Sequence, residues 1–105
     1  MEKTISQMNE KMESIASLYL KARGEINRSS RLANNDEIQD IRVKYVEFIN
    51  QCFEKLDERE REIINNEFFF QEYPLWWKSI YTTNIFLKLK KKAIIHFLGV
   101  YYGDN

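Results

Sequence analysis

Apolar residues recur along the first quarter of the chain in alternating steps of three and four. They stand at Ile5, Met8, Met12, Ile15, Tyr19, Ala22 and Ile26. This spacing is a heptad repeat over three heptads. Thr4 and Gln7 have the spacing of a capping box, so we expect a long helix that begins there and ends near Gly24. The polar stretch 27–35 has turn composition and predicts a connecting loop.

The heptad seam allows two interpretations. It packs on the next helix of the same chain as an antiparallel hairpin, or it pairs with a second chain as a parallel coiled coil. Two methionines, Tyr19 and Ala22 occupy seam positions where Ile, Val and Leu normally specify a two-stranded zipper. We therefore favour packing within one chain, and a homodimer stays open.

A second helix is predicted from about residue 34 to residue 56. Asn34 and Glu37 have capping-box spacing, and the acids that follow suit the positive end of the helix dipole. The apolar residues of this helix form a stripe that is wider than a two-helix seam needs, so we expect the helix to be contacted on two sides. Its apolar members are Ile38, Ile41, Tyr45, Phe48, Cys52 and Leu56, flanked by Val46, Ile49 and Phe53.

Three further helices are predicted in the C-terminal half. Asp57 and Glu60 form a capping-box pair that begins a helix running through residues 68–70. Pro74 suits the first turn of a short helix over residues 75–80. Thr82 or Thr83 caps a last helix that ends near Gly99. No segment alternates with period two, so the predicted fold is all-α with five helices in a single domain, 1–105.

That domain has three predicted parts. Residues 1–33 form the N-terminal helix and loop, residues 34–56 the central helix, and residues 57–105 a unit with helix-turn-helix proportions.

The amino-acid composition limits the kinds of disulfide and metal site that the chain can form. The 105 residues include one cysteine, Cys52, and one histidine, His96, so neither an internal disulfide nor a multi-cysteine zinc site is expected. This favours a reducing, cytoplasmic location. The N-terminus lacks the pattern of a secretory signal, and no apolar run approaches the ~20 residues of a membrane span, so no membrane partner is expected.

The charge is divided along the chain although it sums to zero. Residues 1–75 hold 11 basic and 15 acidic residues, a net charge of −4. Residues 76–105 hold five lysines against Asp104 alone, a net charge of +4. Such asymmetry indicates a basic end that attracts a polyanion and an acidic body that weakens non-specific binding.

The C-terminal half resembles a known family. The segments LDEREREIINNEFFF and YTTNIFLKLKKKAIIHFL are similar to region 4 of bacterial sigma factors, and more closely to the small ArpU-type transcriptional regulators of phages and Firmicutes. The resemblance implies a helix-turn-helix whose last helix enters the major groove, and it implies RNA polymerase as a protein partner. It extends from about Phe48 to the end of the chain. Trp76 and Trp77 stand where the family carries a glycine turn, and the promoter-melting sigma domain is lacking, so a regulator is implied.

The last helix carries the predicted DNA contacts. With Phe86, Leu89, Ala93 and Phe97 toward the core, its outward face near the start is polar and basic. Asn and Thr side chains there suit base edges, Leu suits a thymine methyl, and lysines suit phosphates. The simpler interpretation is that Lys90–Lys92 only solvate the negative end of the helix dipole. The predicted DNA-binding residues are Thr83, Asn84, Leu87, Lys88, Lys91 and Lys92.

Other reactive side chains are expected to be structural. Adjacent Trp76 and Trp77 point about 100° apart on a helix, so one is expected to be buried and the other to stack at an interface or against another helix. His96 is expected to be partly buried and satisfied, and Cys52 to act as a small hydrophobe. The acids at 57–62 are expected on a solvated face with local ion pairs.

Two functions follow from the sequence. The first is a small transcription regulator that binds double-stranded DNA, with RNA polymerase as a further partner. The alternative is a non-catalytic helical module for protein interaction or self-association that does not bind DNA. No glycine-rich phosphate loop and no nucleophile arrangement is present, so we expect neither an enzyme nor a bound cofactor or metal. The last stretch, IIHFLGVYY, is predicted to complete the core by folding back after Gly99 or to contact a partner.

Overall fold

The chain folds into helices only, over the residues that the structure describes. A computed structural model describes residues 4–32 and 36–103, apart from the side chains of residues 28–32 and 36–40. The elements are α1 (Ile5–Leu32), α2 (Asp36–Glu54), α3 (Glu58–Ile64), the π-helical turn η1 (Asn65–Phe69) and α4 (Thr83–Tyr102). The all-α prediction is confirmed for this part of the chain. Four α helices form, so the prediction of five was wrong.

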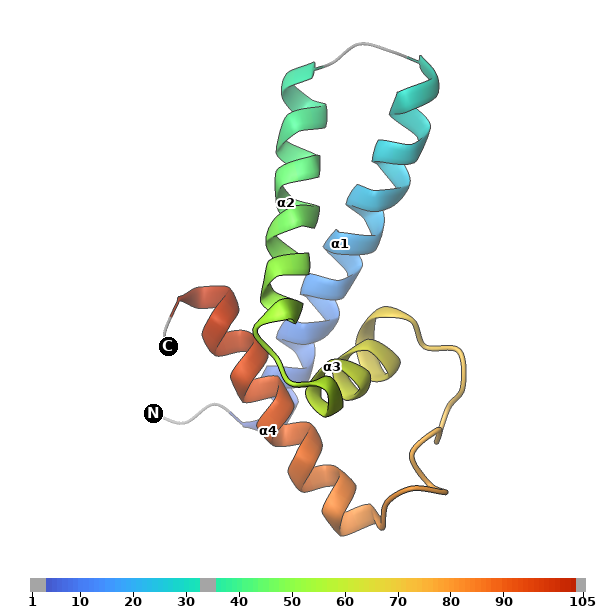
Figure 1. Cartoon of the computed structure of the whole chain (residues 1–105), viewed down its shortest axis with the longest axis vertical. Coiled ribbons are helices and arrows are strands. Elements are labelled where there is room, and N and C mark those ends of the chain that lie inside the picture. Colours follow the sequence, from blue (N-terminus) through green and yellow to red (C-terminus); the bar gives the residue numbers. More distant parts are fainter. Residues whose placement is uncertain (1–3, 33–35, 104–105) are drawn as a thin grey trace.

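Helices α1 and α2 form a tall antiparallel hairpin, and α3 and α4 pack at its lower end (Figure 1). The structure spans 49 × 33 × 23 Å along its principal axes, and the hairpin lies along the long dimension with the start of α4 beyond its lower end. None of the described helices is long and apolar enough to cross a lipid bilayer.

Helix α1 begins where its capping residues predict and ends later. The Thr4 and Gln7 backbone amides each donate to the other residue's side chain, at 3.0 and 3.2 Å. The helix then passes through Gly24 and ends at Leu32, so the predicted end at Gly24 and the predicted loop over residues 27–32 were wrong. Residues 33–35 of that loop lie outside the described part. The helix continues because extending an existing helix costs little free energy. Beyond Gly24, the ion pair between Arg42 Nε and Glu25 Oε2 at 2.7 Å also joins α1 to α2.

The heptad seam is used within the chain. Met8, Met12, Ile15, Tyr19 and Ala22 are buried. They face α2, α4 and η1. This confirms the intramolecular interpretation and leaves the centre of the seam no surface for a parallel zipper.

Helix α2 is contacted on two sides, as its wide stripe predicts. Ile49 and Cys52 are buried in the core. The other side reaches α4, where the Phe48 and Tyr101 rings lie 5.3 Å apart and the Tyr45 and Tyr101 hydroxyls are 3.3 Å apart. Ile41, expected in the stripe, is instead 68% exposed; it lies in the first two turns of α2, whereas the buried Ile49 and Cys52 lie toward the other end of this helix.

Helix α3 starts at the predicted capping box and ends in a wide turn. Asp57 Oδ1 accepts from the Glu60 amide at 2.8 Å, and Glu60 Oε1 accepts from the Asp57 amide at 3.0 Å. From Asn65 the helix widens, and the Phe70 amide donates to the Asn65 carbonyl at 2.8 Å. This turn buries both Phe68 and Phe69.

The predicted short helix over residues 75–80 was wrong. The segment is a series of turns, in which the Trp76 amide donates to the Tyr73 carbonyl at 3.2 Å and the Ile80 amide to the Trp77 carbonyl at 2.9 Å. Pro74 and Leu75 occupy the centre of the first turn, and Leu75 has a left-handed φ of 58°. A residue in that region cannot belong to a right-handed helix, so Leu75 is excluded from one. The residues after it form separate turns, one of them closed by the Tyr81 amide and the Trp77 carbonyl at 2.9 Å.

Helix α4 begins at Thr82, whose Oγ1 accepts from the Ile85 amide at 3.4 Å. It continues through Gly99 to Tyr102 and is capped by Gly103 at φ 74°, so the predicted end at Gly99 was wrong. The last turn completes the core without folding back, since Tyr101 packs on Phe97.

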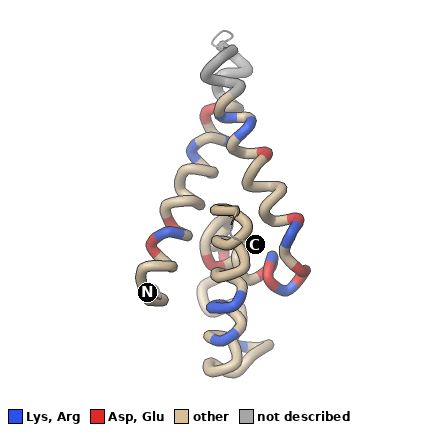
Figure 2. The backbone as a smooth tube through the Cα atoms, turned by 90° about the vertical axis from the view of Figure 1, so that its left-hand side faces the viewer, with Lys and Arg blue, Asp and Glu red and all other residues tan. Residues whose placement is uncertain are grey.

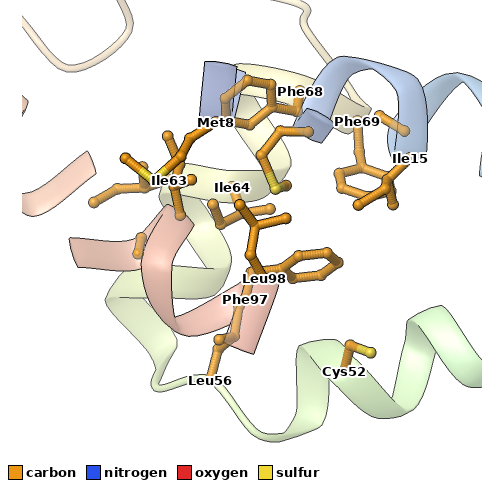
Figure 3. Packing of buried hydrophobic residues seen from close by; sticks show 14 of the residues in the cluster. Met8, Ile15, Cys52, Leu56, Ile63, Ile64, Phe68, Phe69, Phe97 and Leu98 are labelled. Atoms are coloured by element: carbon orange, nitrogen blue, oxygen red, sulfur yellow. The ribbon is translucent and has the colours of Figure 1, made fainter. Parts of the chain in front are cut away.

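The hydrophobic core lies where all four helices meet, and Figure 3 shows their side chains converging. Burial of large apolar side chains from distant segments holds the four helices together there. Its fully buried large members are Phe86, Phe97, Met12, Ile49, Ile63, Ile64, Ile94 and Cys52.

Candidate nucleic-acid interface

The outward face of α4 carries every residue that the sequence assigns to DNA contact. Phe86, Ala93 and Phe97 turn toward the core and are at most 2% exposed. The helical period therefore sends the residues on the opposite side of α4 to solvent. Leu87 is 54% exposed. The six exposed candidates are Thr83, Asn84, Leu87, Lys88, Lys91 and Lys92.

The lysines of this helix are not equivalent. Lys88, Lys91 and Lys92 form no ion pair with any described residue. Lys90 turns inward, where its Nζ lies 2.8 Å from Glu67 Oε1 and 5.3 Å from the Phe68 ring centroid. Figure 2 shows the lysines in the lower half of α4, with no acidic residue on that helix.

Glu67 holds three segments together. Its second carboxylate oxygen, Oε2, accepts a hydrogen bond from Trp76 Nε1 at 3.0 Å. The carboxylate thus joins η1 to both the 70–82 segment and α4. The sequence analysis missed this residue, because Glu67 and Lys90 are 23 positions apart and no periodic signal connects them.

Phe86 is the second anchor between α4 and the 70–82 segment. Trp77 stacks on it with ring centroids 4.4 Å apart and an interplanar angle of 5°. Trp76 meets it edge-on at 5.8 Å. The expectation that one tryptophan is buried was wrong, because the turns leave both indoles half-buried. The expected stacking against another helix is found for Trp77, which lies on Phe86 of α4.

The connection between α3 and α4 differs from the short turn of a helix-turn-helix. Thirteen residues, 70–82, separate the end of η1 from the start of α4, whereas that motif uses a 3–4-residue turn. The two helices still pack directly, and His96 Nδ1 of α4 lies 2.9 Å from Glu60 Oε1 of α3. The prediction that His96 is partly buried and satisfied is confirmed.

The acidic run at the start of α3 is only partly a solvated face. Glu58 and Glu62 are exposed. Glu60 is 7% exposed, so its assignment to the solvated face was wrong. The capping box and His96 satisfy its carboxylate and make burial tolerable.

Two groups in the core have shifted acidity. Burial raises the pKa of the Cys52 thiol, which is 1% exposed. Burial, with the hydrogen bond to Tyr101, also raises the pKa of Tyr45. Within the described residues no three His, Cys, Asp or Glu side chains are grouped so as to hold a metal ion.

Comparison of the chain with protein-family models, with curated proteins and with solved structures finds no match. The exposed face of α4 is therefore interpreted from its own residues.

Proposed function

We propose that this protein is a small DNA-binding regulator of transcription that uses the outward face of α4 to contact duplex DNA. The observation that carries the proposal is the set of three exposed lysines, Lys88, Lys91 and Lys92, without ion-pair partners among the described residues. A cationic side chain that is not neutralised within the protein remains available to phosphates.

The proposed contacts divide by chemistry. Asn84 and Thr83, in the first turn of α4, would meet base edges, and Asn pairs with adenine through two hydrogen bonds. Leu87 would contact a thymine methyl group. The lysines would neutralise phosphates and supply affinity without sequence preference.

The salt dependence of binding can be estimated from the lysines. Three phosphate contacts give a slope of about −2.7 in log affinity against log salt, which weakens binding about fortyfold between 50 and 200 mM salt. The zero net charge of the whole chain limits attraction beyond these contacts.

The test is fluorescence anisotropy of labelled duplex DNA pools at 50 mM salt. The double variant Lys88→Glu with Lys91→Glu is expected to lose binding and keep its helical circular dichroism. The matched control is Lys21→Glu with Lys55→Glu, which makes the same charge change at exposed positions off α4 and should bind within about threefold of the unsubstituted chain. The proposal is wrong if no duplex binds at 50 mM salt or if both double variants weaken binding equally.

The wider setting of the proposal rests on the resemblance to sigma region 4. It implies cytoplasmic action and RNA polymerase as a second partner. A homodimer would place two copies of α4 on neighbouring half-sites. Copurification of the tagged chain with polymerase tests the first of these partners, and light scattering on the DNA complex tests the second.

A second function is favoured by one observation on the same helix. Ile85, Leu87 and Ile95 are each 51–54% exposed beside the lysines. Exposed aliphatic side chains suit a protein partner or self-association better than a phosphate backbone. Light scattering from micromolar to millimolar protein, with Ile95→Ser as the variant, distinguishes the two functions. Dimerisation that Ile95→Ser removes, without any DNA binding, would support this second function.

A further inference from the structure

A groove of about 460 Å³ lies on the side of Lys90, away from the exposed stripe of α4. Its walls come from α1, η1, the turns of the 70–82 segment and α4. The volume is within the ~300–1,000 Å³ range of small-molecule sites. The left-handed turn at Leu75 sets the outer wall.

The charge of the groove leaves one carboxylate unmatched. Glu67 and Lys90 both line it, and they neutralise each other at 2.8 Å. Glu13 lines the α1 wall and forms no ion pair with any described residue. The groove therefore presents a net negative charge to a ligand.

A hydrogen-bond acceptor on the same wall also lacks a partner. Asn9 precedes Glu13 by one helical turn, so the two side chains share a face of α1. Asn9 Oδ1 is shielded from solvent and receives no hydrogen bond from the described residues. Leaving a buried acceptor unsatisfied costs about 1–3 kcal/mol, so a rotation of the Asn9 side chain that turns Oδ1 toward a ligand N–H in the groove is favoured.

The remaining lining is mixed, with three aromatic residues beside Asn66, Gln71, Pro74 and Leu75. The aromatic residues are Phe68, Tyr73 and Trp77. Trp77 uses one face to stack on Phe86. Aromatic faces attract cations and bury apolar stems, which suits an organic cation better than a bare metal ion.

We propose that this groove binds a small organic monocation, a primary ammonium on an apolar or aromatic stem. The ammonium donates to the Glu13 carboxylate and to Asn9 Oδ1, and the stem packs against Trp77 and Tyr73. This site is separate from the proposed DNA contacts and does not depend on them.

The test is an NMR titration of the ¹⁵N-labelled full chain with phenethylammonium at pH 7. We expect saturable shifts of the Asn9, Glu13 and Trp77 amide signals. The neutral isostere 2-phenylethanol should bind at least about tenfold more weakly, because it lacks the charge-assisted hydrogen bonds. Glu13→Gln should weaken phenethylammonium by about tenfold for the same reason.

The matched control is Glu10→Gln, which removes the same charge from an exposed position on α1 outside the groove. It should bind phenethylammonium as the unsubstituted chain does. The inference is overturned by shifts that do not saturate, by equal binding of the neutral alcohol, or by equal weakening in Glu10→Gln and Glu13→Gln. Because no DNA is present, these outcomes leave the proposed function to its own test.

Discussion

Replacing Phe86 by alanine removes the ring on which the 70–82 segment rests. The ring is 2% exposed and contacts Trp77 by stacking, Trp76 by its edge and Tyr81 at 6.2 Å. Truncating a buried Phe to Ala costs about 3–5 kcal/mol of unfolding free energy. Since three aromatic contacts are lost as well, we expect the upper part of this range, at least about 4 kcal/mol of lost unfolding free energy.

That loss is a large fraction of the ~5–15 kcal/mol typical of a domain. It should lower the melting temperature by about 15 °C or more. The assay is urea unfolding, followed in parallel by far-ultraviolet circular dichroism and by tryptophan fluorescence. The fluorescence of the folded variant should also shift to the red, because Trp76 and Trp77 lose the surface that shields them.

The control is Phe70→Ala. Phe70 is 41% exposed and its ring contacts the Arg23 guanidinium at 5.5 Å, so its loss should cost below about 1 kcal/mol. The packing argument fails if the two variants unfold within about 1 kcal/mol of each other. It also fails if Phe86→Ala keeps the tryptophan emission of the unsubstituted chain.

Three further variants test the backbone and the core. An added Cβ meets nothing within 4 Å at Gly24 or at Gly103, but Gly103 has a φ of 74°. In urea unfolding, Gly24→Ala should therefore stabilise the fold by about 0.5–1 kcal/mol, and Gly103→Ala should destabilise it by about 1 kcal/mol. The raised pKa of Tyr45 means that folding favours the neutral phenol. The contribution of this phenol to stability is complete below the unfolded pKa of about 10 and is lost as pH rises above it. Tyr45→Phe should therefore flatten the fall of the urea midpoint between about pH 10 and 12. Cys52 should react with a disulfide reagent roughly a thousandfold more slowly in the folded chain than in urea, and equal rates would mean that the thiol is not buried.

Helix starts were predictable from the sequence because capping is local. The pairs Thr4 with Gln7 and Asp57 with Glu60, and the single cap Thr82, fix three starts through neighbours three positions away. Helix ends were not predictable from Gly24 and Gly99, because a glycine inside a helix costs only about 1 kcal/mol and packing of the following turn exceeds that. In α4 that packing comes from Tyr101.

The segment 70–82 was misassigned for a different reason. Pro74 fits the first turn of a helix and the centre of a tight turn equally well, and the sequence does not reveal the left-handed conformation of Leu75. What fixes the turns is contact with Phe86 and Glu67, which are distant in the chain.

The candidate DNA face was predictable as an exposed stripe because helical periodicity alone determines it. The difference between Lys90 and the other lysines of α4 was not predictable. Lys90 belongs to an unbroken run of three lysines in the sequence, yet only the tertiary structure brings Glu67 to it. The groove between α1 and the 70–82 segment was missed for the same reason, since Glu13 and Trp77 come together only in the folded chain.

The wide turn η1 makes the length of the chain critical at one place. Its hydrogen bond from Phe70 to Asn65 encloses one residue more than an α-helical turn does. Deleting a single residue there would restore an ordinary turn and rotate everything beyond it by about 100°. Phe69 would then leave the rings of Phe53 and Phe97, which it now meets at 4.9 and 6.1 Å. A shortened homologue of this protein should therefore lose residues from the turns at 70–82 and keep all five of η1.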